Sequence, residues 1–256
     1  MRYELLGPIR VVDGNKTSSV SARKVEILLA ALLIRSDRVV GTDQLMIEIW
    51  GENPPRRATA GLHVYISQLR KFLTRVTHGR SPILTTQKGY LLSLGSHELD
   101  VHIFRRMIQQ GRNHHRAGQL VESYNAFQEA LDLWRGPALG GLHDGPLMNS
   151  FAGWAEQARL ACLEELVDAA LLLGRHRQFI GFLYSLTTEY PLREAFRRQL
   201  MLALYRSGCQ ADALNVYQSL RTVLKDELGL EPCRMLKDLQ RAILLGDPEL
   251  EVCAAA

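Results

Sequence analysis

The chain has 256 residues, of which 46% are hydrophobic, enough for one large or two ordinary packed domains. Residues 1–96 hold 14 Lys and Arg against 7 Asp and Glu, whereas residues 97–256 hold 17 against 20, so the net charge of +4 divides into +7 and −3. Four scattered cysteines without Cys-x-x-Cys spacing and the lack of any long apolar run argue against a zinc site, a disulfide framework and a membrane span.

The N-terminal residues predict a small antiparallel sheet followed by two helices. YELLG, PIRVVD and KTSSV alternate around a turn at Asp13-Gly14-Asn15. Apolar residues then recur at helical spacing in ARKVEILLAALLIR, and we expect Ser21 to cap this helix. Thr42 is the expected cap of a second, short helix, TDQLMIEIW, which Gly51 and the Pro54-Pro55 pair end.

Between Asn53 and His97 the chain has no Asp or Glu, although its average composition predicts about five acids in such a window. This asymmetry indicates a surface that lies against a polyanion. The basic residues of the window are Arg56, Arg57, Arg70, Lys71, Arg75, Arg80 and Lys88.

A third helix is predicted over residues 56–76, with one apolar stripe and a basic opposite face. The stripe consists of Leu62, Ile66, Leu69 and Leu73. Gly61 lies within this helix, where it lowers helix propensity, and we interpret it as allowing close approach of a backbone or a base edge.

Residues 81–94 (SPILTTQKGYLLSL) form two β-like runs around Gln87-Lys88-Gly89, a hairpin pattern. The order of sheet, three helices and hairpin is typical of a winged helix-turn-helix, in which the third helix enters the major groove and the hairpin is the wing. We therefore predict a DNA-binding domain over residues 1–96.

From Asp100 onward the sequence predicts helices only. Gly174 and Gly208 are 34 residues apart, which is the tetratricopeptide period, and HRAGQLVESYNAFQEAL around Gly118 resembles YRSGCQADALNVYQSL around Gly208. We interpret the small residues at these turns as allowing paired helices to approach closely. The expected fold is mainly α, with an all-α, tetratricopeptide-like helical-repeat domain over residues 97–256.

The chain resembles the Streptomyces antibiotic regulatory proteins over nearly its whole length. The resemblance is carried by LLGPIRV, SARK, VVGTDQLMIEIWGENPPRRA, LHVYISQLRKFL, ILTTQKGYLL and the segment from EYPLREAF to DELGLEP. It implies an OmpR-like winged helix, then a bacterial transcriptional activation domain, in the small, pathway-specific type of activator. It also implies binding to direct repeats in promoters of antibiotic (secondary-metabolite) gene clusters and recruitment of RNA polymerase holoenzyme, including its sigma factor.

The expected DNA contacts are of two kinds, because phosphate contacts position a protein and base contacts specify sequence. The base-reading candidates are Arg57, Ala60, His63, Val64, Ser67, Gln68 and Lys71. The phosphate and wing candidates are Arg23, Lys24, Arg56, Arg75, Thr85, Thr86, Lys88 and Gly89.

Several neighbouring residues have a plainer expected role. We expect Arg70 to make an intramolecular contact and Trp50 to pack in the core. For Tyr65, a core position and a DNA contact are equally compatible with the sequence. His114 and His115 lack a ligand partner at metal spacing and are expected to be exposed.

The sequence contains no nucleophile motif, no paired carboxylates and no Gly-rich phosphate loop, so we expect no enzymatic activity, no cofactor and no metal. The N-terminus lacks a signal-peptide pattern, so we expect a cytoplasmic, nucleoid-associated protein that self-associates on double-stranded DNA. Two alternatives remain: a helical-repeat adaptor that binds proteins, or a repressor, each with an accessory DNA-binding module.

Overall fold

The computed structural model describes residues 1–77, 79 and 81–251, which form two compact units. Unit 1 comprises Met1–Gln109 and Glu129–Leu160, and unit 2 comprises Gln110–Gln128 and the residues from Ala161 onward. The helices of the described residues include none that is both long and apolar enough to cross a membrane.

Unit 1 contains two small sheets. The strands β1 (Arg2–Glu4), β2 (Arg10–Asp13), β3 (Lys16–Ser18) and β7 (Glu98–Leu99) form one sheet in the order β3-β2-β1-β7, in which only β7 is parallel to its neighbour. The strands β4 (Val40–Gly41), β5 (Ile83–Thr86) and β6 (Gly89–Leu92) form the second in the order β4-β6-β5. The predicted N-terminal strands and the hairpin are confirmed, whereas the sequence did not predict β7.

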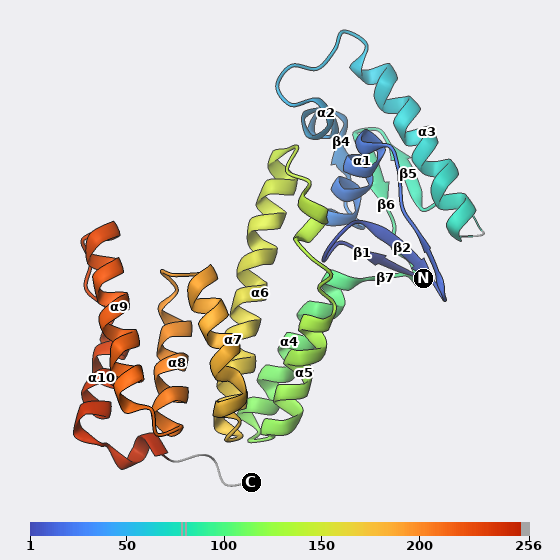
Figure 1. Ribbon diagram of the computed structural model, residues 1–256. Helices are drawn as coiled ribbons and strands as arrows, with labels where there is room; N and C mark the ends of the chain where they lie inside the picture. The colour runs from blue at the N-terminus through green and yellow to red at the C-terminus, as the bar shows by residue number, and fades with distance from the viewer. Residues whose placement is uncertain (78, 80, 252–256) are drawn as a thin grey trace. The chain divides into compact units, whose positions relative to one another are not determined.

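Three helices, α1 (Arg23–Ile34), α2 (Thr42–Trp50) and α3 (Ala58–Thr77), pack together beside the hairpin (Figure 1). The helix α1 is almost wholly apolar and carries eight buried residues, so it forms the centre of this core. The winged-helix plan is confirmed, but the two predicted caps are not. Ala22 and Gly41 occupy the cap positions, and neither supplies a side-chain hydrogen bond.

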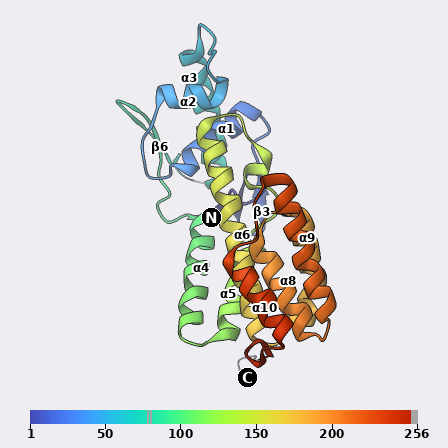
Figure 2. The same cartoon turned by 90° about the vertical axis from the view of Figure 1, so that its left-hand side faces the viewer.

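From Asp100 onward the described residues are helical, as predicted. The helices are α4 (Asp100–Arg116), α5 (Leu120–Asp132), η1 (Ala138–Gly141), α6 (Pro146–Leu172), α7 (His176–Glu189), α8 (Glu194–Arg206), α9 (Gln210–Leu228), α10 (Arg234–Leu245) and η2 (Pro248–Glu251). In unit 2, α8 lies against α7 and α9 (Figure 1), and α8 and α9 lie side by side in both views (Figures 1 and 2).

The glycines of the predicted repeat lie at equivalent helix–helix turns, but for a different reason from the one expected. Gly118, Gly174 and Gly208 have φ values of 73°, 72° and 83°, which favour glycine. A Cβ added at Gly118 or Gly208 would contact nothing within 4 Å. These glycines therefore allow the left-handed turn. Close helix approach occurs instead at Gly111, where an added Cβ would lie 2.6 Å from the Phe127 ring.

Unit 1 includes residues beyond the predicted DNA-binding domain, namely 97–109 and 129–160. Asp100, at the start of α4, is 1% exposed, and its carboxylate accepts backbone N–H bonds from Leu5 at 2.8 Å and Leu6 at 2.9 Å. Arg135 lies 3.2 Å from the buried carboxylate of Glu4. Buried polar groups require partners, so these contacts attach α4 and the segment after α5 to the N-terminal sheet.

Asp100 makes the stability of unit 1 depend on pH. Burial raises the pKa of its carboxyl from 3.8 to about 6, although the N–H groups of Leu6 and Leu5 oppose this shift. The folded state then holds the Asp100 proton more tightly than the unfolded state, so its stabilisation is complete below pH 3.8 and is lost as the pH rises through about 6. We expect the free energy of unfolding to fall by about 3 kcal/mol across this window.

Urea titrations from pH 4 to 7 measure this fall, and Asp100→Asn should remove the part of the pH dependence that Asp100 causes. An equal pH slope in that variant would contradict the assignment.

Candidate nucleic-acid interface

The helix α3 presents one buried and one exposed face. Its buried residues are Ala58, Leu62, Ile66, Leu69, Leu73 and Val76. The predicted stripe is therefore confirmed and extended by one residue at each end. At a rise of about 1.5 Å per residue, this helix is about 30 Å long, and its outer face is available to a partner along that length.

The base-reading candidates all lie on the exposed face of α3 or just before it. Val64, near the middle of the face, is 53% exposed although it is apolar. The described residues of the window from 54 to 96 contain no acidic side chain, so this face is positively charged. The exposed candidates are Arg57, Ala60, His63, Val64, Ser67, Gln68 and Lys71.

Trp50, at the end of α2, packs against α3 and so helps to fix the angle between the two helices. Its ring lies 5.8 Å from that of Tyr65, and an added Cβ at Gly61 would lie 3.2 Å from it. Gly61 thus accommodates the indole, not a base edge as the sequence suggested. The ammonium of Lys24 lies 5.2 Å from the same indole, which is a cation–π distance. Trp50 therefore packs between α2 and α3, although it is half-buried and not in the core as expected, and Tyr65 is half-buried beside it.

A buried carboxylate anchors α2. Glu48 is fully buried, and its Oε1 accepts the N–H of Leu147 at 2.9 Å, at the start of α6. Burial raises the pKa of this carboxyl, while the N–H groups of Leu147 and Met148 lower it. A carboxylate at a helix N-terminus is favourable because the first N–H groups have no partner within the helix. The orientation of α2 is thereby linked to α6.

The wing is held to α3 by Arg70. Its guanidinium donates to the carbonyl of Ile83 at 3.2 Å and to the hydroxyl oxygen of Thr85 at 2.7 Å. Arg70 therefore makes the predicted intramolecular contact. The hairpin β5–β6 extends beside the helices in Figure 2. Thr85 is exposed and keeps its own hydroxyl proton to donate, so it stays available as a phosphate contact.

Two other wing candidates have internal roles. The hydroxyl of Thr86 donates to the carbonyl of Gly89 at 3.1 Å. Gly89 is buried, pairs with Gly41 and has a φ of 153°. An added Cβ there would lie 2.0 Å from the carbonyl oxygen of Val40. Thr86 and Gly89 thus serve the turn and the β4–β6 pair, and their expected role as donors to DNA stays a prediction.

The basic phosphate candidates also divide into two groups. Arg23 donates from Nη2 to both carboxylate oxygens of Asp144, at 2.9 and 3.1 Å, so its charge is balanced within unit 1. Its expected phosphate role stays a prediction, and the Arg23 side chain is 69% exposed. Arg56, Arg75 and Lys88 are exposed, and within the described residues none of them has an ion-pair partner. Arg80 lies outside the described residues.

Sequence reasoning missed two exposed residues of this surface. Thr59 is exposed at the second residue of α3, and the first residues of a recognition helix are the ones that meet base edges. Its position beside the base-reading candidate Ala60 could have identified it from the sequence. Leu84 is 54% exposed on β5, and strand alternation alone would have placed it opposite the buried Ile83.

The chain matches two family models. The model described as "Transcriptional regulatory protein, C terminal" matches residues 16–92, and the model "Bacterial transcriptional activator domain" matches residues 99–244. The second match covers more than half of the 256 residues.

Curated relatives match along almost the whole chain. Regulatory protein DnrI of Streptomyces peucetius is 35% identical over 98% of this chain and 94% of its own length. Transcriptional regulator RedD of Streptomyces coelicolor is 36% identical over 100% of this chain and 73% of its own length. Regulatory protein AfsR of Streptomyces coelicolor is 37% identical over 100% of this chain, which spans only 25% of that protein.

A solved structure has the same fold. Mycobacterium tuberculosis EmbR, in complex with a low affinity phosphopeptide, superposes with a TM-score of 0.90 at 31% identity, covering 99% of this chain and 68% of EmbR. Both matched family models describe transcriptional regulators, RedD is named as one, and DnrI and AfsR are named as regulatory proteins. With its winged helix followed by an activator domain, this chain belongs to the Streptomyces antibiotic regulatory protein family.

Proposed function

We propose that this chain is a sequence-specific, double-stranded-DNA-binding transcription activator of a secondary-metabolite gene cluster. The observation that carries DNA binding is the exposed face of α3, which lacks acids and carries Lys71, with the exposed Arg57 just before the helix. Positive side chains displace counterions from the phosphates, and the side chains at the centre of the face meet base edges. Lys24, Arg56, Arg75, Thr85 and Lys88 are the proposed phosphate contacts.

The finer parts of the proposal rest on family membership. They are binding to direct repeats in promoters, self-association of copies on DNA, and recruitment of RNA polymerase holoenzyme through its sigma factor. Direct repeats require head-to-tail copies on one face of the duplex, with repeats spaced near one helical turn. Such a protein acts in the cytoplasm, on the nucleoid, and needs no catalytic residue or cofactor.

Selection from randomised duplexes, followed by footprinting, tests the proposal, because the protein itself then chooses its operator sequence. We expect enrichment of a motif repeated in the same orientation about 10–11 base pairs apart, and weaker binding to a scrambled repeat at about 150 mM salt. Equal affinity for selected and scrambled duplexes would contradict sequence-specific binding. Transcription from the selected promoter with purified holoenzyme then tests activation, and a fall in transcript would indicate a repressor.

Two substitutions separate the roles of the wing and α3. Lys88→Ala should weaken binding to all duplexes by similar factors and reduce the salt slope by about 1, because one phosphate contact is lost. Arg57→Ala should cost about 1–3 kcal/mol on the selected motif and relax preference at one base pair. Anisotropy titrations at several salt concentrations measure both effects. If Arg57→Ala lowered affinity for all sequences equally, Arg57 would be a phosphate contact instead.

A further inference from the structure

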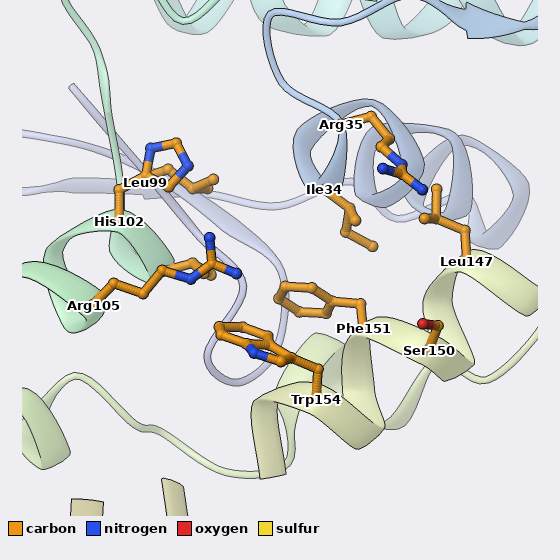
Figure 3. A pocket seen from close by; sticks show the side chains of 10 residues that line it. Ile34, Arg35, Leu99, His102, Arg105, Leu147, Ser150, Phe151 and Trp154 are labelled. Carbon is orange, nitrogen blue, oxygen red and sulfur yellow. The ribbon is translucent and has the colours of Figure 1, made fainter. Parts of the chain in front are cut away.

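Unit 1 contains a cavity of about 230 Å³ that is separate from the exposed face of α3. It lies among the end of α1, β7, the start of α4 and the first turns of α6. Figure 3 shows Phe151 and Trp154 on α6, with Arg105 reaching toward Trp154 from α4, and Arg35, just after α1, beside Leu147. The DNA-binding proposal uses none of these residues.

The cavity combines an apolar floor with cationic groups. Trp154 is 36% exposed, so part of its indole faces the open side of the cavity. The apolar lining residues are Ile34, Leu99, Val101, Leu147, Phe151 and Trp154. The remaining lining residues are Arg35, His102, Arg105 and Ser150, so the lining contains no acid.

The two guanidinium groups of the cavity are not neutralised by acids. Among the described residues, neither Arg35 nor Arg105 forms an ion pair. Arg105 lies 4.1 Å from the centroid of the Trp154 ring, a stacking distance that orients the guanidinium while leaving its N–H edges available. Partial burial and the Arg105 charge lower the pKa of His102, against the opposing charge of Asp37. The two guanidinium groups, without ion-pair partners in the described part of the chain, therefore favour the binding of an anion in this cavity.

The size and lining point to a planar ligand with one negative end. An apolar cavity of about 150 Å³ holds one benzene ring, so about 230 Å³ accommodates an aromatic ring system with a small polar group. A carboxylate matches the fork of a guanidinium, and Ser150 can donate one further hydrogen bond. We propose that this cavity binds a small aromatic carboxylate, with its ring on Phe151 and Trp154 and its carboxylate on Arg105.

Calorimetric titration of the full chain with 2-naphthoate tests the proposal. We expect saturable, sub-millimolar binding, and binding of the neutral analogue 2-naphthamide that is at least about tenfold weaker, because the charged hydrogen bond is lost. Inorganic phosphate, an anion without a ring, should compete only weakly. Naphthamide binding as tight as naphthoate, phosphate competition at equal concentration, or no saturation would each overturn the proposal.

Neighbouring arginines on α4 supply a matched pair of variants. Arg105→Gln should weaken 2-naphthoate binding about tenfold, whereas Arg106→Gln should leave it unchanged, because Arg106 is exposed outside the cavity lining. Ser150→Phe should abolish binding by filling the cavity, and since Ser150 is exposed the fold should tolerate it. Thermal unfolding of each variant verifies folding. Equal affinities for Arg105→Gln and Arg106→Gln, or unchanged binding by Ser150→Phe, would overturn the assignment.

Discussion

Val64→Glu is expected to weaken DNA binding about 100-fold, which corresponds to about 2.7 kcal/mol. The substitution removes an apolar contact and places a carboxylate at the centre of a face that has no acid, where it would meet phosphates or base-edge acceptors. Stability should change little, because the Val64 side chain is 53% exposed in the free protein. Anisotropy titration of the selected duplex measures the affinity.

Val121→Glu is the matched control for this experiment. Val121 lies on α5 in unit 2 and is 47% exposed, so the same change of charge occurs on a similarly exposed valine outside the α3 face. We expect its DNA affinity to stay within about twofold of the unsubstituted chain at physiological salt. Equal loss in both variants would show that total charge, not the α3 face, governs binding. Retention of affinity by Val64→Glu would exclude α3 as the reading helix.

Gly89→Ala is expected to reduce the free energy of unfolding by about 4 kcal/mol. Its φ of 153° is strained for a residue with a Cβ, and that Cβ would lie 2.0 Å from the Val40 carbonyl oxygen, so β4 and β6 would have to separate. Since the wing lies on β5 and β6, we also expect weaker DNA binding through loss of the Lys88 position. Urea titration measures the stability, and limited proteolysis reports opening of the hairpin.

Gly14→Ala separates the two causes of the expected loss of stability in Gly89→Ala, which are the positive φ and the close approach to the Val40 carbonyl. Gly14 also has a positive φ, of 55°, but an added Cβ there meets nothing within 4 Å. Its substitution should cost only about 1 kcal/mol of backbone strain. A similar cost for both variants would mean that the close approach to Val40 contributes nothing.

The helical stripe and the hairpin could be predicted because their patterns are local. The apolar residues of α3 recur at the spacing of one helix face, and burial followed that spacing from Leu62 to Leu73. The wing followed from two β-like runs around a Gly-containing turn. The exposed positions of Val64 and Lys71 are consequences of the same periodicity.

The roles of individual polar residues could not be predicted, because their partners are distant in sequence. Arg23 pairs with Asp144, 121 residues away, and Glu48 bonds to the N–H of Leu147, 99 residues away. Asp100 similarly accepts from Leu5, 95 residues away. No periodicity within a short window reports such contacts, so the sequence did not predict the ion pair of Arg23 or the attachment of α4 to the N-terminal sheet.

The sequence by itself determined the winged-helix plan, the helical continuation, the family and the acid-free face, since local periodicity and composition encode all of them. Only the tertiary structure decided which cations remain unpaired, that Gly61 and Gly89 serve internal packing, and that Arg35, Arg105 and Trp154 surround one cavity. The physical reason is that chain folding brings together groups whose separation in sequence carries no signal, and their mutual distance fixes their charge balance and exposure.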